Sequence, residues 1–206
     1  MKKYLPWLFT SIWLAALSFG MGVLWVYDHT PGKDGKVPDH WPAQSKIPRA
    51  SGQPILIMFA HPQCPCTRAS IGELAVLMAH CQYQVTAWVV FFRPKGSAED
   101  WLHTDLWRSA EAIPGVKVLP DEEGKEARWF QVATSGHVVL YDGDGKLFFS
   151  GGVTSSRGHA GDNAGRSDIM QWLGHKTSAP AETPVFGCSL LDAPPVGNKQ
   201  ETGCPP

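Results

Sequence analysis

Two cysteines separated by one proline are the residues of this sequence whose types and spacing most directly indicate chemistry. Cys64 and Cys66 flank Pro65 between an apolar run and a segment with helical periodicity. Proline suits the first helical position, where an amide hydrogen would be unpaired anyway, so the pattern predicts Cys64 at the N-cap. The free backbone donors and the positive end of the helix dipole would stabilise a thiolate there, and Arg68 would add a positive field. We therefore predict Cys64 as an attacking thiol and Cys66 as the thiol that resolves the mixed disulfide.

The same segment allows two other interpretations. The two cysteines could be buried or paired for structural reasons alone. Alternatively, His61, Cys64 and Cys66 offer soft ligands suited to Cu(I) or zinc, although a complete ligand set is not evident from the sequence. A disulfide between Cys64 and Cys66 would close a small ring with a tight bend at Pro65, and strained disulfides are more easily reduced. This strain favours a redox role over a structural bond.

Three further cysteines occur outside this motif. Cys81 falls at the end of the predicted helix that follows the motif, where a cysteine is typically a small core residue. Cys188 and Cys204 flank a proline-bearing loop. We expect them to form a disulfide that holds this part of the chain, with a second resolving role for Cys188 as the alternative. The total of five is odd, so at least one thiol is unpaired within the chain.

A glycine-rich segment occupies residues 151–165. It lacks the Gly-Lys-Ser/Thr ending of a phosphate-binding loop, so nucleotide binding is not expected. Its Arg157, His159, Asp162 and Asn163 could line the cysteine site, because loops that follow strands often carry function. A hydrogen-bonded structural loop is the alternative.

The elements that must position the cysteines follow from the apolar patterns. Residues 54–60 form a continuous apolar run, which is typical of a strand buried on both faces of a sheet. Residues 67–81 repeat apolar residues at helical spacing, and the Asp-Gly turn at 142–145 predicts a hairpin. The predicted elements are strands at 54–60, 85–92, 115–119, 138–141 and 146–150 and helices at 67–81, 97–112, 121–130 and 167–173. Their order predicts an α/β domain with a central mixed sheet flanked by helices.

The chain divides into four predicted segments. Residues 1–27 contain Lys2 and Lys3 near their start and no charged residue from Tyr4 to Tyr27. This uncharged stretch is long enough for one transmembrane helix. A cleaved signal peptide is the alternative, but the apolar stretch runs well past the small-residue cleavage site. The lysines favour an extracytoplasmic, periplasmic side for the remainder. The remainder comprises a linker at 28–53 with no expected core, the α/β domain at 54–176, and an extended proline-rich tail at 177–206.

Composition limits the classes of partner and function that we expect for this chain. A formal net charge of -1 provides no broad basic field, so no nucleic-acid partner is expected. We expect protein or small-molecule thiols and disulfides as substrates, membrane contact through the N-terminal helix, and no resident cofactor, with copper as the alternative. The first predicted function is a thiol–disulfide oxidoreductase. An extracytoplasmic copper-handling protein is the second, and a redox-silent interaction domain is the third.

Four sequence blocks carry a resemblance to a known family. The motif HPQCPCTRAS and the later blocks TSGHVVLYDGDG, RGHAGDN and VFGCSL resemble those of bacterial RedB proteins. The element order is similar to that of the TlpA and peroxiredoxin-like branch of membrane-tethered thioredoxin-like proteins. The likeness covers residues 54–190. It implies a thioredoxin-like fold and thiol redox chemistry at Cys64 and Cys66.

The chain departs from the family pattern near the site. The usual Cys-x-x-Cys is shortened by one residue. Ser135 and Gly136 replace the proline expected before the first hairpin strand, which weakens the expectation of partner docking there. Related peroxidases carry a threonine three residues before the reactive cysteine, where this chain has His61 relative to Cys64. Peroxidase activity is therefore not expected.

Overall fold

A continuous apolar run forms the central strand of the sheet. The computed structural model describes residues 4–81, 84–175 and 181–191. Strand β1 (Ile55–Ala60) is buried along its whole length, because its alternate side chains enter the cores on opposite faces of the sheet. It pairs in parallel with β2 (Thr86–Arg93) and antiparallel with β4 (His137–Tyr141). The predicted strand at 54–60 is confirmed.

The described strands form one six-stranded sheet in the order β3-β2-β1-β4-β5-β6. The other strands are β3 (Val116–Glu122), β5 (Leu147–Gly151) and β6 (Ala181–Glu182), and the helices of the domain are α2 (Thr67–Cys81), α3 (Asp105–Glu111), α4 (Lys125–Trp129) and α5 (Ala164–His175). Strands β1, β2 and β3 are parallel, whereas β4 and β5 form an antiparallel hairpin. This β-α-β unit, followed by a hairpin and a helix, confirms the predicted thioredoxin-like fold with a central mixed sheet.

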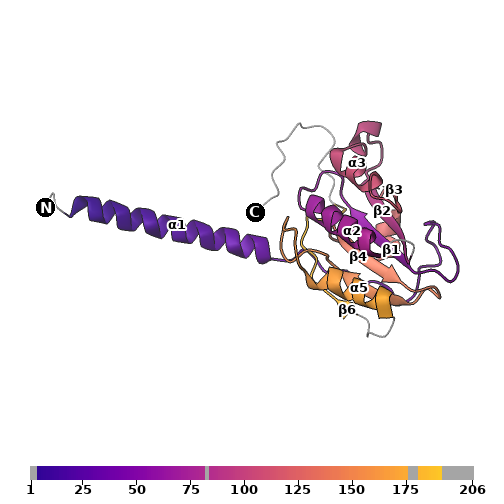
Figure 1. Cartoon of the computed structure of the whole chain (residues 1–206). Helices are drawn as coiled ribbons and strands as arrows, with labels where there is room; N and C mark the ends of the chain where they lie inside the picture. Colours follow the sequence, from indigo (N-terminus) through magenta and orange to yellow (C-terminus); the bar gives the residue numbers. More distant parts are fainter. Residues whose placement is uncertain (1–3, 82–83, 176–180, 192–206) are drawn as a thin grey trace.

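Two hydrophobic cores, one on each face of the sheet, hold these elements together. Helices α2, α3 and α5 bury their apolar sides in the first core, and Figure 1 shows α2 and α5 side by side over the sheet. The second core includes Phe130, at the end of α4, and Tyr141 of β4. Because α2 is packed along its length in the first core, its N-terminal end is fixed where β1 ends.

The helix predicted at 97–112 is interrupted. A short 3-10 turn (Glu99–Trp101) precedes α3, and Thr104 in extended conformation caps α3 by accepting from the N–H of Trp107. The helix predicted at 121–130 is shorter than expected, because α4 begins at Lys125 with Gly124 as its N-cap residue. Asp121 belongs to β3, and its carboxylate accepts from the N–H groups of Glu126 and Ala127 in α4.

Residues 28–53 pack on the domain rather than standing apart from it. Ile47 is 3% exposed and joins the second core, and the hydroxyl of Tyr141 donates to the carbonyl of Pro38 at 2.9 Å. The expectation that this segment contributes no core is therefore wrong for Ile47. Single apolar residues without periodicity give no strand or helix signal, although they can still fill a pocket on a sheet.

The tail predicted at 177–206 is likewise not extended throughout. Residues 181–191 return to the domain, where β6 pairs with β5 and the side chains of Val185, Phe186 and Leu190 are buried. We call residues 185–190 the C-terminal arm. These residues belong to the folded domain, so its boundary lies beyond the predicted residue 176.

One helix within the described residues, α1 (Leu5–His29), is long and apolar enough to cross a membrane. Figure 1 shows α1 projecting from the domain as a single helix. Its end contacts the glycine-rich loop: the N–H of Arg157 donates to the carbonyl of Asp28, and the Arg157 guanidinium lies 5.0 Å from the ring centre of Tyr27. This length and composition are those of a membrane-crossing segment, and a signal sequence near an N-terminus has them as well.

Candidate functional site

The cysteine motif forms a series of tight turns between β1 and α2. The carbonyls of Cys64, Pro65 and Cys66 accept from the N–H groups three residues further along the chain, at distances of 3.2, 3.3 and 3.2 Å. Helix α2 begins at Thr67, so Cys66, and not Cys64, is the residue immediately before it. The predicted N-cap position of Cys64 is thus two residues too early. Such i to i+3 turns commonly precede helices and delay their regular start.

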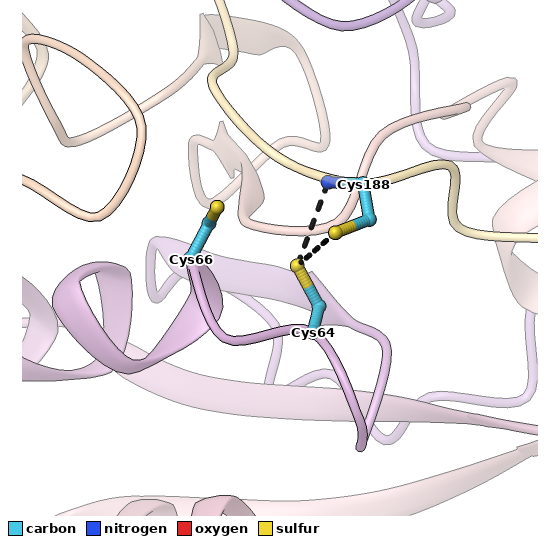
Figure 2. Close-up of side chains that lie close together, drawn as sticks. All are labelled: Cys64, Cys66 and Cys188. Carbon is cyan, nitrogen blue, oxygen red and sulfur yellow. Dashed lines mark hydrogen bonds between the residues drawn. The ribbon is translucent and has the colours of Figure 1, made fainter. Parts of the chain in front are cut away.

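Three cysteine sulfurs converge at these turns. Cys64 and Cys188 share a hydrogen bond with their Sγ atoms 2.9 Å apart, and the N–H of Cys188 donates to Cys64 Sγ at 3.5 Å (Figure 2). Cys66 completes a group whose sulfurs all lie within 4.8 Å of one another. Cys64 is 2% exposed and Cys66 is 8% exposed, whereas Cys188 is partly exposed. The structure therefore brings the predicted pair together and adds Cys188 to it.

The surroundings of Cys64 favour its thiolate. Hydrogen bonds from the side chains of Cys188, first, and then Cys66 lower the pKa of Cys64 far below its ordinary value of 9.0. Burial opposes this shift, while the Thr67 side chain and the backbone of Cys188 add to it. A sulfur that accepts several hydrogen bonds is stabilised in its charged form. The predicted thiolate is thus supported, through thiol and hydroxyl donors.

Arg68 does not act as predicted. Its guanidinium forms an exposed ion pair with Asp105 at the start of α3 and lowers the pKa of that carboxyl. The main causes of the lowered Cys64 pKa are thiol, hydroxyl and backbone hydrogen bonds, and Arg68 is not among them. Its positive charge is paired with a carboxylate of another element, and sequence spacing alone does not reveal this pairing.

The C-terminal arm holds Cys188 against the domain. Residues 133–135 precede β4, and the arm runs antiparallel to them through a bridge between Thr134 and Ser189. The N–H of Ser135 donates to the Cys188 carbonyl at 2.9 Å. A Cβ atom at Gly187 would overlap the carbonyl of Ser135, so the close approach of the two backbones requires glycine. Arg157, predicted to support the site, does so indirectly by donating to the Gly187 carbonyl at 2.8 Å.

Two buried hydroxyls, which no pattern in the sequence predicted as site residues, connect the motif to the segment before β4. Ser135 Oγ accepts from the N–H of His61 at 2.7 Å and lies 2.6 Å from Thr67 Oγ1. Thr67 in turn contacts Cys64. Ser135 lies just before the hairpin strand, where the family pattern has proline. This departure from the family pattern was the one feature of the sequence that singled out Ser135.

His61 lies beside the cysteine group but is not a member of it within the described residues. Its Nδ1 accepts from the N–H of Gln63 at 3.2 Å, and its ring packs on Phe92 and Trp101. The soft-ligand set suggested by the sequence therefore changes: Cys188 takes the place of His61 beside Cys64 and Cys66.

The remaining predicted residues lie elsewhere. Cys81 is buried in the first core, and burial raises the pKa of its thiol, in agreement with a packing role. His159 is exposed on the glycine-rich loop. Cys204, and with it the predicted Cys188–Cys204 disulfide, lies outside the described residues.

The glycine-rich loop is fastened to α2 by a buried carboxylate. Glu73 accepts from the N–H of Gly161 at 2.7 Å and from Asn163 Nδ2 at 3.2 Å, and it forms an ion pair with Arg166. Asp162 pairs with the same arginine at the surface. Asn163 and Asp162 therefore have structural contacts, as the second of the two interpretations of this loop predicted.

Comparison with known proteins supports the fold. No protein-family model matches the chain, and no curated protein sequence matches it. An uncharacterized conserved protein from Geobacillus kaustophilus is similar in structure, with 20% identity, a TM-score of 0.55, and coverage of 81% of this chain and 94% of that one. A hypothetical protein from Sinorhizobium meliloti 1021 has 17% identity, a TM-score of 0.59, and coverage of 79% and 97%.

StoA from Bacillus subtilis aligns at 14% identity with a TM-score of 0.45, covering 70% of this chain and 98% of that one. At such low sequence identity, the similarity to the Geobacillus kaustophilus and Sinorhizobium meliloti proteins shows a shared fold and nothing about activity. Strand order, hairpin and flanking helices together give this chain a thioredoxin-like fold, with its three-cysteine group where the first strand meets the first helix of the domain.

Proposed function

We propose that this chain is a membrane-anchored, extracytoplasmic thiol–disulfide oxidoreductase in which the sulfur of Cys64 reacts first. One observation carries the proposal: Cys64 Sγ has two other cysteine sulfurs within 4.8 Å, and hydrogen bonds lower its pKa. The thiolate, not the thiol, is the form of cysteine that attacks a disulfide. With a second thiol in reach, the mixed disulfide that results can be resolved within the protein.

Each turnover transfers two electrons. The Cys64 thiolate attacks one sulfur of a substrate disulfide, the substrate S–S bond breaks, and the other sulfur leaves as a thiolate that takes a proton from solvent. A neighbouring protein thiol then loses its proton to solvent and attacks Cys64 Sγ, which expels the second substrate sulfur as a thiolate that solvent protonates. The substrate ends as two thiols and the protein as an internal disulfide. The reverse sequence of steps oxidises a substrate dithiol.

Turnover of a small aromatic disulfide by the reduced full chain in detergent tests this function. Release of the coloured aromatic thiolate should show a fast phase that depends on Cys64. If the reduced protein releases no more than its denatured form does, the site is not an exchange site. The third predicted function, a redox-silent interaction domain, would then be favoured.

Topology gives a second test. The motivation is the pair Lys2 and Lys3 before an uncharged helix, since short lysine-flanked ends are retained inside. In right-side-out membrane vesicles, a membrane-impermeant maleimide should label the cysteines of the reduced domain as fully as it does after lysis. A Tyr4→Cys variant of a cysteine-free chain is the control, because the other end of α1 should be labelled only after lysis. Labelling of the domain only after lysis would show the opposite topology.

Copper handling is the second candidate function, favoured by the group of three sulfurs. Cu(I) is a soft ion that prefers thiolates. If the group holds copper, the reduced full chain should bind Cu(I), and Cys188→Ser should weaken the affinity at least about tenfold. His61→Ala, at a residue outside the group, should have a clearly smaller effect. Absence of Cu(I) uptake in competition with a moderate chelator would exclude this function.

A further inference from the structure

The C-terminal arm presents Cys188 to Cys64 in a fixed orientation. On one side, the arm is bonded to residues 133–135, with the N–H of Leu190 donating to the Ala133 carbonyl at 2.8 Å and the N–H of Ser135 donating to the Cys188 carbonyl at 2.9 Å. The N–H of Cys188 donates to Cys64 Sγ. Figure 2 shows the Cys64 side chain turned toward Cys188, with both contacts drawn. The arm therefore places one particular sulfur opposite the reacting sulfur.

The contact between the two sulfurs and the turns around Pro65 favour Cys188 over Cys66 as the partner of Cys64 in a disulfide. The 2.9 Å between Cys64 Sγ and Cys188 Sγ is only about 0.9 Å longer than a disulfide bond. Cys64 and Cys66 are held in overlapping turns whose carbonyls are bonded to Thr67 and Ala69 at 3.2 Å each. A bond between these two cysteines would have to bend the chain at Pro65 between them, whereas a bond from Cys64 to Cys188 leaves the turns in place.

We propose that Cys188 is the resolving thiol, so that the redox disulfide of this protein joins Cys64 to Cys188 while Cys66 stays a thiol. The inference rests on the proposed function for its place in a catalytic cycle. In the resolving step, Cys188 loses its proton to solvent and its sulfur attacks Cys64 Sγ. The bond between Cys64 and the substrate sulfur breaks, and the substrate leaves as a thiolate that is protonated by solvent. The protein disulfide is reduced again by an external dithiol.

The burial of Cys64 gives the arm a second part in this cycle. Cys64 is only 2% exposed, and the arm lies over it, so a substrate disulfide reaches Cys64 when the arm lifts. Return of the arm then delivers Cys188 to the mixed disulfide. Gly187 is the residue that lets the arm approach Ser135, and the Arg157 guanidinium fastens the same residue.

Disulfide mapping tests the pairing without any substrate. The reduced full chain in detergent is treated with one equivalent of the thiol oxidant diamide, alkylated in acid, digested and analysed by mass spectrometry. The Cys64–Cys188 peptide pair should exceed the Cys64–Cys66 linkage at least about tenfold, because proximity sets the yield of competing intramolecular reactions. A predominant Cys64–Cys66 or Cys188–Cys204 disulfide would overturn the inference.

Trapping of the substrate tests the role in exchange. With an aromatic disulfide, Cys188→Ser should retain the mixed disulfide on Cys64 at least about tenfold longer than Cys66→Ser does. If Cys188→Ser turns over like the wild type and Cys66→Ser is the variant that traps, only the pairing is wrong and the proposed function stands. Loss of the fast phase in the wild type itself would instead defeat the proposed function, whatever the mapped disulfide is.

A glycine variant tests the arm independently of its cysteine. Gly187→Ala should prevent close docking, raise the alkylation rate of Cys64 about tenfold and lower the yield of the Cys64–Cys188 disulfide. Gly72→Ala in α2 is the matched control, because a Cβ there meets no atom within 4 Å and should leave both measurements unchanged. Equal behaviour of the two variants would show that the arm does not control access to Cys64.

Discussion

Replacing Cys64 with serine should slow the release of thiolate from an aromatic disulfide roughly 1,000-fold, which corresponds to about 4 kcal/mol of activation free energy. The serine hydroxyl keeps its proton near neutral pH, whereas the hydrogen bonds around Cys64 lower its pKa and keep its sulfur charged. The measurement is a single-turnover assay with the reduced full chain in detergent.

Two variants show whether the loss is specific. Cys81→Ala removes a thiol from the first core, away from the three-cysteine group, and should leave the rate unchanged once folding is verified. Cys66→Ala removes one hydrogen-bond donor of the Cys64 thiolate and should slow the attack by less than Cys64→Ser does. A Cys64→Ser variant that keeps the wild-type rate would assign the attack to Cys66 or Cys188 and end the proposed mechanism.

The part of the site that lies between β1 and α2 could be predicted from the sequence alone. Residues 54–60 are apolar without interruption because β1 is covered on both faces, and this is a pattern that few other elements share. The helix at 67–81 was predicted with the bounds that α2 has. Cys64 and Cys66 lie on the connection between these two elements, so their mutual proximity could be predicted from local information.

The arm could not be predicted in this way. Its position depends on backbone hydrogen bonds to residues 133–135 and on single buried side chains, and neither leaves a periodic signal in the sequence. The block VFGCSL contains the relevant residues, an apolar pair followed by a glycine and a cysteine. The resemblance quoted this block, but nothing local indicates that Gly187 meets Ser135 or that Cys188 meets Cys64.

The expected contribution of Arg68 could not be judged from the sequence for the same reason. Arg68 was expected to add a positive field at Cys64, yet it pairs with Asp105, which belongs to α3. The donors that lower the pKa of Cys64 include Cys188, which is distant in sequence. The charges and hydrogen bonds at a buried group depend on which residues the tertiary fold brings near it. They can therefore be deduced only once the fold is known.

The last prediction concerns a buried histidine beside this site. His137 opens β4 opposite Phe59, is 3% exposed, and has its Nε2 2.9 Å from Ser150 Oγ. Its Nδ1 has no hydrogen-bond partner among the described residues. Burial lowers the pKa of His137 to about 4, from 6.5. The folded protein therefore holds this ring neutral over a pH range in which the unfolded chain would protonate it.

The sign of the effect follows from which state binds the proton. Between pH 6.5 and 4 the unfolded chain takes up a proton at His137 that the folded state refuses, so the free energy of unfolding falls as the pH falls. The contribution of the neutral ring is fully present above pH 6.5, and about 3 kcal/mol is lost by pH 4. Burial raises the pKa of Asp121, which acts in the opposite direction and is common to all variants compared.

His137→Gln should remove this dependence, because glutamine offers a hydrogen bond to Ser150 and does not titrate. Urea unfolding from pH 7.5 to 4 should show a free energy of unfolding that falls about 3 kcal/mol less in His137→Gln than in its parent. Both proteins should carry Cys64→Ser, since the lowered pKa of Cys64 would add its own slope over the same range. His40→Gln is the matched control at an exposed histidine and should follow the parent. Parallel curves for His137→Gln and the parent would mean that His137 is protonated in the folded state, and the β4 end of the site would then carry a positive charge instead of a neutral ring.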